Sequence, residues 1–174
     1  HRDLHSFPTR RSSDLLILTS CATGPGPATK LEKAAVLPLA LNDKYQFRKV
    51  KLYLFNNEPV PFTTSEPVLF ERERMMWGTV EYREREQRYG NYFTFFWRTS
   101  VRSDVTVRLE YRQAALGSYV MAQERYYPDA RGSFVSRFDV TGDDYLESGA
   151  VTGWRALLIV DGKVVALTQS FIWR

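Results

Sequence analysis

Apolar and polar residues alternate along much of the chain, and this period of two constrains the fold more than any other feature. Between residues 105 and 112 the apolar members are Val105, Val107, Leu109 and Tyr111, and polar or charged residues stand between them. Successive side chains of a strand point to opposite faces, so the pattern predicts a strand with one buried and one solvated face. A similar alternation over residues 49–54 predicts a second such strand.

Turn signals separate the apolar runs at short intervals. Asp161-Gly162 stands between two apolar runs and predicts a hairpin, because a type I′ turn needs positive φ at both central residues. Further breaks are expected at Asn56-Asn57, Gly90-Asn91, Ser103-Asp104, Pro128-Asp129 and Gly142-Asp143. The best helical candidate runs from Leu31 to Leu41, but Pro38 interrupts it.

These features favour a single β domain over residues 35–174. Aromatic residues make up 14% of the chain, which suits strands because rings fit a pleated, half-buried surface. We expect an all-β fold, a single antiparallel β-sandwich (immunoglobulin-like or related) of about seven to nine strands. A small β-barrel is the alternative.

Residues 1–15 read HRDLHSFPTRRSSDL and show no apolar period. The stretch resembles one translated reading frame of an adapter primer used in short-read sequencing libraries, so it is excluded from fold reasoning as a tag would be. Both histidines, His1 and His5, lie in this stretch. Without imidazole, residues 16–174 lack the Ser-His-Asp and Cys-His arrangements of nucleophilic catalysis and the commonest metal ligand.

An apolar stub, two small polar residues and the single cysteine of the chain follow at residues 16–21. Leu18-Thr19-Ser20-Cys21 resembles the lipobox of bacterial lipoproteins. The resemblance implies cleavage before Cys21 after a diacylglyceryl group has been attached to its sulfur. Residues 16–20 are then the remnant of a signal peptide, and Cys21 is a lipidation site that holds the protein on a membrane.

Residues 21–34 are expected to be the lipidated cysteine and a flexible tether, because glycine and proline interrupt the stretch and aromatics are absent. Ala22 is uncharged, which by resemblance to proteobacterial lipoproteins is compatible with passage to the outer membrane. The expected location is therefore the bacterial cell envelope, lipid-anchored, with the periplasmic side of the outer membrane favoured.

Charge is spread along the chain rather than concentrated. The formal net charge of +4 does not arise from a basic block, so we expect no nucleic-acid partner. The run from Glu71 to Arg88 mixes both signs at close spacing and is interpreted as a charged face or edge of paired strands. A surface for an acidic partner is the alternative.

Carboxylates gather in the segment 141–149, which carries Asp143, Asp144 and Glu147. Such a group could bind calcium or, with another acid such as Glu110, hydrolyse a glycosidic bond. Its spacing does not match a helix-loop-helix calcium site, and a solvated turn is the simpler interpretation. The chain has no Gly-x-Ser-x-Gly elbow and no phosphate-binding loop, so we expect no catalytic site, metal or cofactor.

Exposed aromatic rings could form a platform that stacks on sugar faces, although rings in a sandwich more often pack in its core. The candidates for ligand contact are Trp77, Tyr82, Tyr89, Tyr92, Tyr126 and Tyr127. The sequence thus predicts a lipid-anchored envelope protein with a non-catalytic binding or assembly domain and an envelope protein or glycan as partner. A carbohydrate-binding module and a carboxylate-based enzyme acting on polysaccharide are the alternatives.

Overall fold

The computed structural model describes residues 25–59 and 64–173, which contain six strands and three short α-helices. In chain order these are β1 (Thr29–Leu31), β2 (Tyr45–Phe55), α1 (Glu66–Met76), α2 (Tyr82–Glu86), β3 (Gly90–Gln113), the 3-10 turn η1 (Ala114–Leu116), β4 (Met121–Thr141), α3 (Asp143–Ser148), β5 (Val151–Val160) and β6 (Lys163–Gln169). All pairs of these strands run antiparallel, so the all-β antiparallel class is confirmed. Cys21, the adapter-like stretch and the signal-peptide remnant lie outside the described residues.

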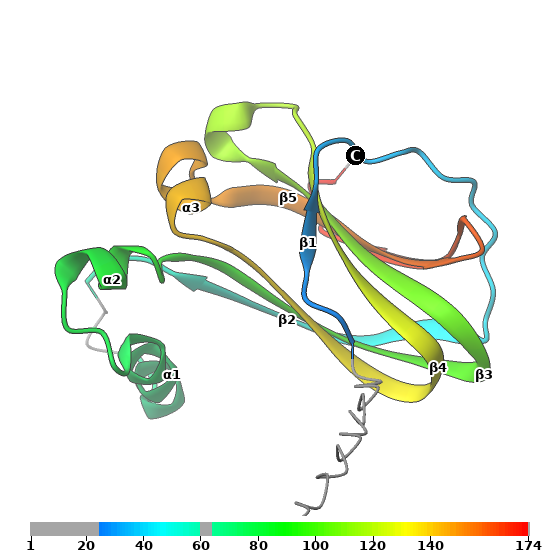
Figure 1. Ribbon diagram of the computed structural model, residues 1–174. Coiled ribbons are helices and arrows are strands. Elements are labelled where there is room, and N and C mark those ends of the chain that lie inside the picture. Colours follow the sequence, from blue (N-terminus) through cyan, green and yellow to red (C-terminus); the bar gives the residue numbers. More distant parts are fainter. Residues whose placement is uncertain (1–24, 60–63, 174) are drawn as a thin grey trace, which may run out of the picture.

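One continuous open sheet folds over to make both layers of the domain (Figure 1). The strand order is β1-β4-β3-β5-β6, and β2 pairs with β3 off this path. β3 pairs with β4 on one side, while its other side pairs first with β2 and then with β5. The first half of β3 therefore shares a layer with β2, and its second half shares a layer with β5 and β6.

The sheet bends where the sequence predicted two turns. Ser103-Asp104 and Pro128-Asp129 do not end strands but lie inside β3 and β4, where the pairing register shifts. Asp129 has a φ of 49°, and its N–H donates to Asp104 Oδ1 at 2.8 Å. Because both strands continue through these bulges, the described residues contain six strands where about seven to nine were expected.

The main core lies between the two layers. The apolar face predicted for residues 105–111 is confirmed, since all four of its apolar side chains are fully buried. Rings from the other layer meet this face, and Trp154 of β5 packs against Phe93 and Phe95 with ring centroids 6.2 and 5.5 Å apart. The two halves of the folded sheet thus share one core.

The opposite face of the same strand was expected to be solvated, and this expectation is wrong in part. Arg108 and Glu110 are only 6% and 3% exposed. Leu157, Ile159 and Val164 form a second small core on this outer face, with Leu37 packed against them. The segment that follows β1 covers the face and buries its charged residues.

The hairpin predicted at Asp161-Gly162 is confirmed. These residues have φ of 49° and 70°, and Val160 pairs with Lys163 across the turn. Positive φ at both central residues is the requirement of a type I′ turn. The turn therefore fixes the register of β5 and β6.

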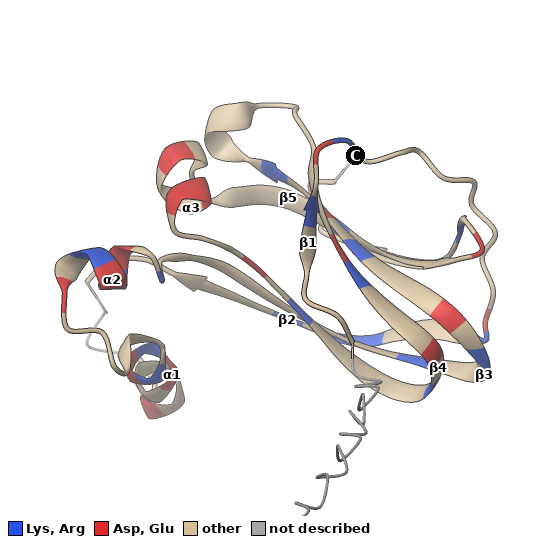
Figure 2. Cartoon of the chain, viewed as in Figure 1, with Lys and Arg blue, Asp and Glu red and all other residues tan. Residues whose placement is uncertain are grey.

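Two other expectations need correction. The charged run from Glu71 to Arg88 lies on helices α1 and α2 and not on paired strands, and Figure 2 shows both signs mixed along them. The segment 31–41 contains no helix, in accord with the interruption by Pro38. The expected tether contains β1, which pairs with residues 122–124 of β4. Among the described residues no helix is long and apolar enough to cross a bilayer.

Candidate functional site

Residues 34–42, which we call the strap, cross the outer face of the layer formed by β3, β5 and β6 (Figure 1). Near its end the strap forms an isolated parallel bridge to β6 between Leu39 and Val164. The Val164 N–H donates to the Pro38 carbonyl at 2.9 Å, and the Ala40 N–H donates to the Val164 carbonyl at 2.8 Å. Proline has no N–H but keeps its carbonyl, so Pro38 prevents a helix and still accepts from β6.

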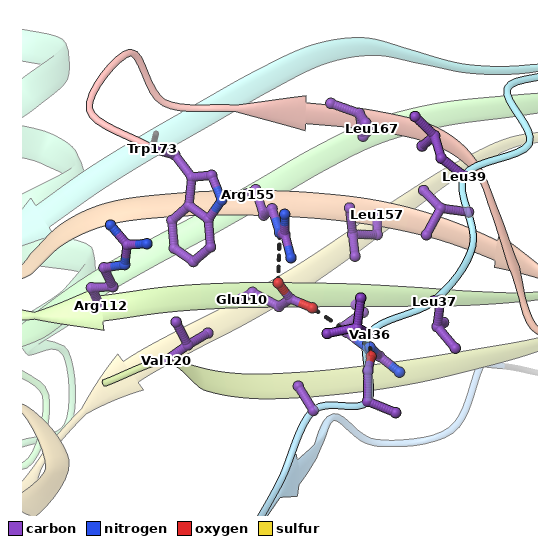
Figure 3. A pocket seen from close by; sticks show the side chains of 14 residues that line it. Val36, Leu37, Leu39, Glu110, Arg112, Val120, Arg155, Leu157, Leu167 and Trp173 are labelled. Carbon is purple, nitrogen blue, oxygen red and sulfur yellow. Dashed lines mark hydrogen bonds and ion pairs between the residues drawn. The ribbon is translucent and has the colours of Figure 1, made fainter. Parts of the chain in front are cut away.

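A cleft of about 520 Å³ lies between the strap and the strands, and we call it the strap cleft (Figure 3). Its volume falls in the range of about 300–1,000 Å³ usual for small-molecule sites. Figure 3 shows Arg112, Trp173 and Arg155 toward one end, and Leu157, Leu167 and Leu39 toward the other. We call these the charged end and the apolar end of the cleft, and the buried Arg108 of β3 pairs with Leu157 of β5 on the floor of the apolar end.

A buried ion network forms the floor of the strap cleft. Arg155 Nε donates to Glu110 Oε2 at 2.6 Å, and Arg108 Nη1 lies 3.5 Å from Glu110 Oε1. Arg108 also donates from Nε to Glu124 Oε1 at 2.6 Å and from Nη1 to the Ala35 carbonyl at 2.7 Å. Arg108 thus joins the sheet to the strap, and both carboxyl oxygens of Glu110 face guanidinium groups.

Trp173 is held between two arginines at the charged end. The guanidinium carbons of Arg112 and Arg155 lie 4.6 and 5.2 Å from the centroid of its ring. Such cation–π contacts contribute about 0.5–2 kcal/mol each, depending on how far the cation is desolvated. The buried indole therefore fixes the position of both cations at the charged end.

Arg112 differs from the other arginines of the strap cleft because its charge is not balanced. Its Nε is buried and has no hydrogen-bond partner. Among the described residues the only other such side-chain atom is Nε of Arg125, which does not line the cleft. The ion pairs on the floor of the cleft engage Arg108 and Arg155 with Glu110 and Glu124, and no ion pair within the described residues engages Arg112. The arrangement can hold an anion at the Arg112 end.

The acidic residues predicted as a possible site lie on α3, apart from this network. Asp143 accepts a hydrogen bond from Gln87 Nε2 at 2.8 Å, and Asp144 forms an ion pair with Lys30. The hydrogen bond from Lys30 to Asp144 raises the pKa of that lysine. Glu147 is exposed on the same short helix, whereas Glu110 lies on the floor of the strap cleft. The structure does not bring Glu110 together with the acids of α3.

Three of the aromatic candidates are exposed on separate elements. Trp77 follows α1 and is 83% exposed, and Tyr82 begins α2 and is 62% exposed. Tyr126 lies on β4, and its hydroxyl donates to Asp104 Oδ2 at 2.7 Å. Trp77 and Tyr82 therefore belong to the helical segment, whereas Tyr126 belongs to the sheet.

The other three aromatic candidates lie deeper. Tyr89 and Tyr127 are buried, and Tyr127 shares a hydrogen bond of 2.6 Å with Ser136, so neither ring is available to a surface ligand. Tyr92 is half-buried, and its hydroxyl donates to the Arg88 carbonyl at 2.7 Å. Burial raises the pKa of Tyr92, which keeps its hydroxyl protonated as a donor.

Tyr92 also lines a second cleft, of about 650 Å³, between α1 and the outer face of the layer that contains β2. Tyr53 and Phe96 add two more rings there, and Lys51 and Arg137 add two cations. Lys51 Nζ lies 5.8 Å from the centre of the Phe96 ring. This second cleft is a basic and aromatic surface.

Sequence reasoning missed the residues of the strap cleft other than Glu110. Charged residues at alternate positions, as at Arg108 and Arg112, are the same pattern that a solvated strand face produces. The available signal was the apolar segment Ala34 to Leu39, which needs a surface to cover. The described residues hold no cluster of three or more His, Cys, Asp or Glu side chains that could bind a metal ion.

Comparison with known proteins adds no relative: no family model, curated protein or solved structure matches this chain.

Proposed function

We propose that the chain is a lipid-anchored protein of the bacterial cell envelope whose β domain binds a ligand or partner without catalysing a reaction. The strap cleft is the binding site in this proposal. The anchor is Cys21, and the proposed location is the periplasmic side of the outer membrane. The neighbouring Leu18-Thr19-Ser20 supports this assignment by its resemblance to a lipobox.

One observation carries the proposal of binding: Arg112, whose Nε is buried and has no partner among the described residues, lines the strap cleft together with an apolar surface. An unsatisfied buried donor costs about 1–3 kcal/mol, so a ligand oxygen at this position gains free energy that solvent does not supply. The surroundings of the four carboxylates considered for catalysis support the non-catalytic assignment. Three of the four, Glu110, Asp143 and Asp144, each have a structural partner, and the fourth, Glu147, is exposed on α3.

The position of β1 limits how far the domain stands from the membrane. Pairing of Thr29 with Glu124 leaves only residues 22–28 between the lipid attachment site and the sheet. Even fully extended, these residues and the flanking bonds span at most about 30 Å, given about 3.3–3.6 Å per residue. The proposed anchor therefore keeps the domain close to the lipid surface.

Mass spectrometry tests the anchor. The chain from Leu16 onward is expressed in a bacterial host behind a complete lipoprotein signal, next to a Cys21→Ser variant. We expect the first protein to be cleaved before Cys21, to carry a diacylglyceryl group and to sediment with membranes, and the variant to remain unlipidated. An unmodified thiol on an uncleaved precursor contradicts the proposal.

Carbohydrate binding is a second candidate, favoured by the second cleft, where Tyr53, Tyr92 and Phe96 stand beside two cations. Flat rings and positive charges together suit an acidic glycan. Binding to an immobilised acidic polysaccharide that falls in Tyr92→Ala but not in Tyr126→Ala supports this candidate. Equal retention of both variants and the parent protein contradicts it.

A further inference from the structure

We propose that the ligand of the strap cleft is an amphiphile with a single negative charge, such as a medium-chain carboxylate. The inference rests on the proposed function in one respect, since it takes the strap cleft as the binding site. It adds the chemical class of the ligand and its orientation. The anionic group lies at Arg112, and the apolar chain lies along Leu157 and Leu167.

The charge of the head follows from the balance of the ion network. Arg108, Arg112 and Arg155 contribute three positive charges to the strap cleft, and Glu110 with Glu124 contributes two negative ones. Among the described residues of the network one positive charge is left, and it belongs to Arg112, whose Nε has no partner among them. A monoanion neutralises the site, whereas a dianion would leave excess negative charge beside Glu110.

The place of the head follows from the ring of Trp173. The cation–π contact at 4.6 Å holds the Arg112 guanidinium against the indole, so the cation is fixed before a ligand arrives. A preorganised donor loses less conformational entropy on binding than a mobile side chain does. Arg155 is already bonded to Glu110, which leaves Arg112, among the described residues that line the cleft, as the cation available to the anion.

The apolar part of the ligand follows from the rest of the lining. Val36 and Leu39 of the strap are 95% and 60% exposed, and Leu167 of β6 is 39% exposed. These side chains line the strap cleft with the buried Leu157. Covering exposed apolar surface is favourable roughly in proportion to its area, so the apolar end of the cleft selects a hydrocarbon chain.

Nuclear magnetic resonance of the arginine Nε–H groups tests this inference on the full 174-residue chain. Decanoate, decanol and acetate are titrated separately, with the two amphiphiles kept below the concentrations at which they aggregate. We expect decanoate to shift the Arg112 Nε–H signal and to bind at least about tenfold more tightly than decanol or acetate, because a charge-assisted hydrogen bond and apolar burial both contribute. Equal binding of decanol or of acetate, or an unmoved Arg112 signal, overturns the inference.

Substitution provides the second readout. Arg112→Gln is expected to weaken decanoate binding by about tenfold to a hundredfold, since it removes the charged donor. Arg131→Gln removes the same charge from an exposed position at the bend of β4 and is expected to leave binding unchanged. Equal affinities for the two variants overturn the inference, and the signal of the unsubstituted protein decides if Arg112→Gln does not fold. If the unsubstituted protein does not bind decanoate while Cys21 is lipidated, this inference is refuted and the proposed anchor still holds.

Discussion

Glu110→Gln removes one charge from the buried network while keeping the size of the side chain. Glu110 is 3% exposed and accepts from Arg155 Nε at 2.6 Å, with Arg108 Nη1 at 3.5 Å. The neutral amide leaves positive charge on the floor of the strap cleft with less compensation. We therefore expect the variant to be less stable than the parent protein.

The magnitude follows from how deeply each member of the network is buried. Breaking a buried ion pair by removing one partner costs about 3–5 kcal/mol. The Arg155 side chain is 36% exposed, so water screens that cation after the change. Arg108 keeps its hydrogen bonds to Glu124 and to the Ala35 carbonyl, which lowers the cost further. The lower end, about 3 kcal/mol, is the expected loss.

Urea unfolding at neutral pH measures this loss. With a slope of about 2 kcal/mol/M, a loss of about 3 kcal/mol moves the midpoint down by about 1.5 M. Glu73→Gln is the matched control, because Glu73 is exposed on α1. A midpoint for Glu110→Gln that agrees with the control within about 0.3 M would refute the account of a stabilising buried network.

Three further predictions concern other parts of the domain. Ser136→Ala is expected to cost about 1–3 kcal/mol, because the indole N–H of Trp97 and the hydroxyl of Tyr127 lose a buried partner; an unchanged thermal midpoint would argue against that network. Gly162→Ala is expected to cost about 1 kcal/mol, since φ there is 70° and an added Cβ meets no neighbour, so the backbone alone causes the loss. Gly26→Ala, whose Cβ would also meet open space, should leave the melting temperature unchanged, and equal effects would count against a turn-specific cost. Hydrogen bonds from the Asp129 N–H and the Tyr126 hydroxyl lower the pKa of Asp104. The ionised carboxylate therefore stabilises the fold at pH values above the unfolded-state pKa, and this stabilisation is lost as the pH falls through the lower folded-state pKa. An NMR titration of Asp104 with an ordinary midpoint would contradict this prediction.

Local patterns correctly predicted the buried strand face and the hairpin, because the physics that sets them is local. The apolar face at residues 105–111 needs only the period of two, and Asp161-Gly162 needs only positive φ. The bulges at Ser103-Asp104 and Pro128-Asp129 were predicted as turns, because the same residue types serve both structures. Turn signals therefore locate the places where a strand changes direction, but not whether its pairing stops there.

The first helix carried signals that were available in the sequence. Ser65 stands at the N-cap of α1, and a proline and Glu66 lie in its first turn, which is a usual helix start. α2 begins with a capping box between Glu81 and Glu84. Neither helix has a continuous apolar stripe or a buried residue. The mixed charges of residues 71–88 were therefore interpreted as a strand face.

The strap cleft could not be predicted from local patterns, because it depends on contacts between distant segments. Arg108 is buried where the strap crosses β3, and its guanidinium donates to the carbonyl of Ala35, 73 residues earlier. Trp173 and Arg112 are likewise brought together by the fold of the sheet. Sequence alternation gives the face on which a side chain lies, while burial of that face depends on which segment crosses it.

A crystal structure of the chain grown with decanoate tests most directly whether the strap cleft is the binding site. We predict density for decanoate in the strap cleft, with its carboxylate at hydrogen-bonding distance from Arg112 Nε and its chain against Leu157. Decanoate bound on another face, with the strap cleft free of it, would contradict the account.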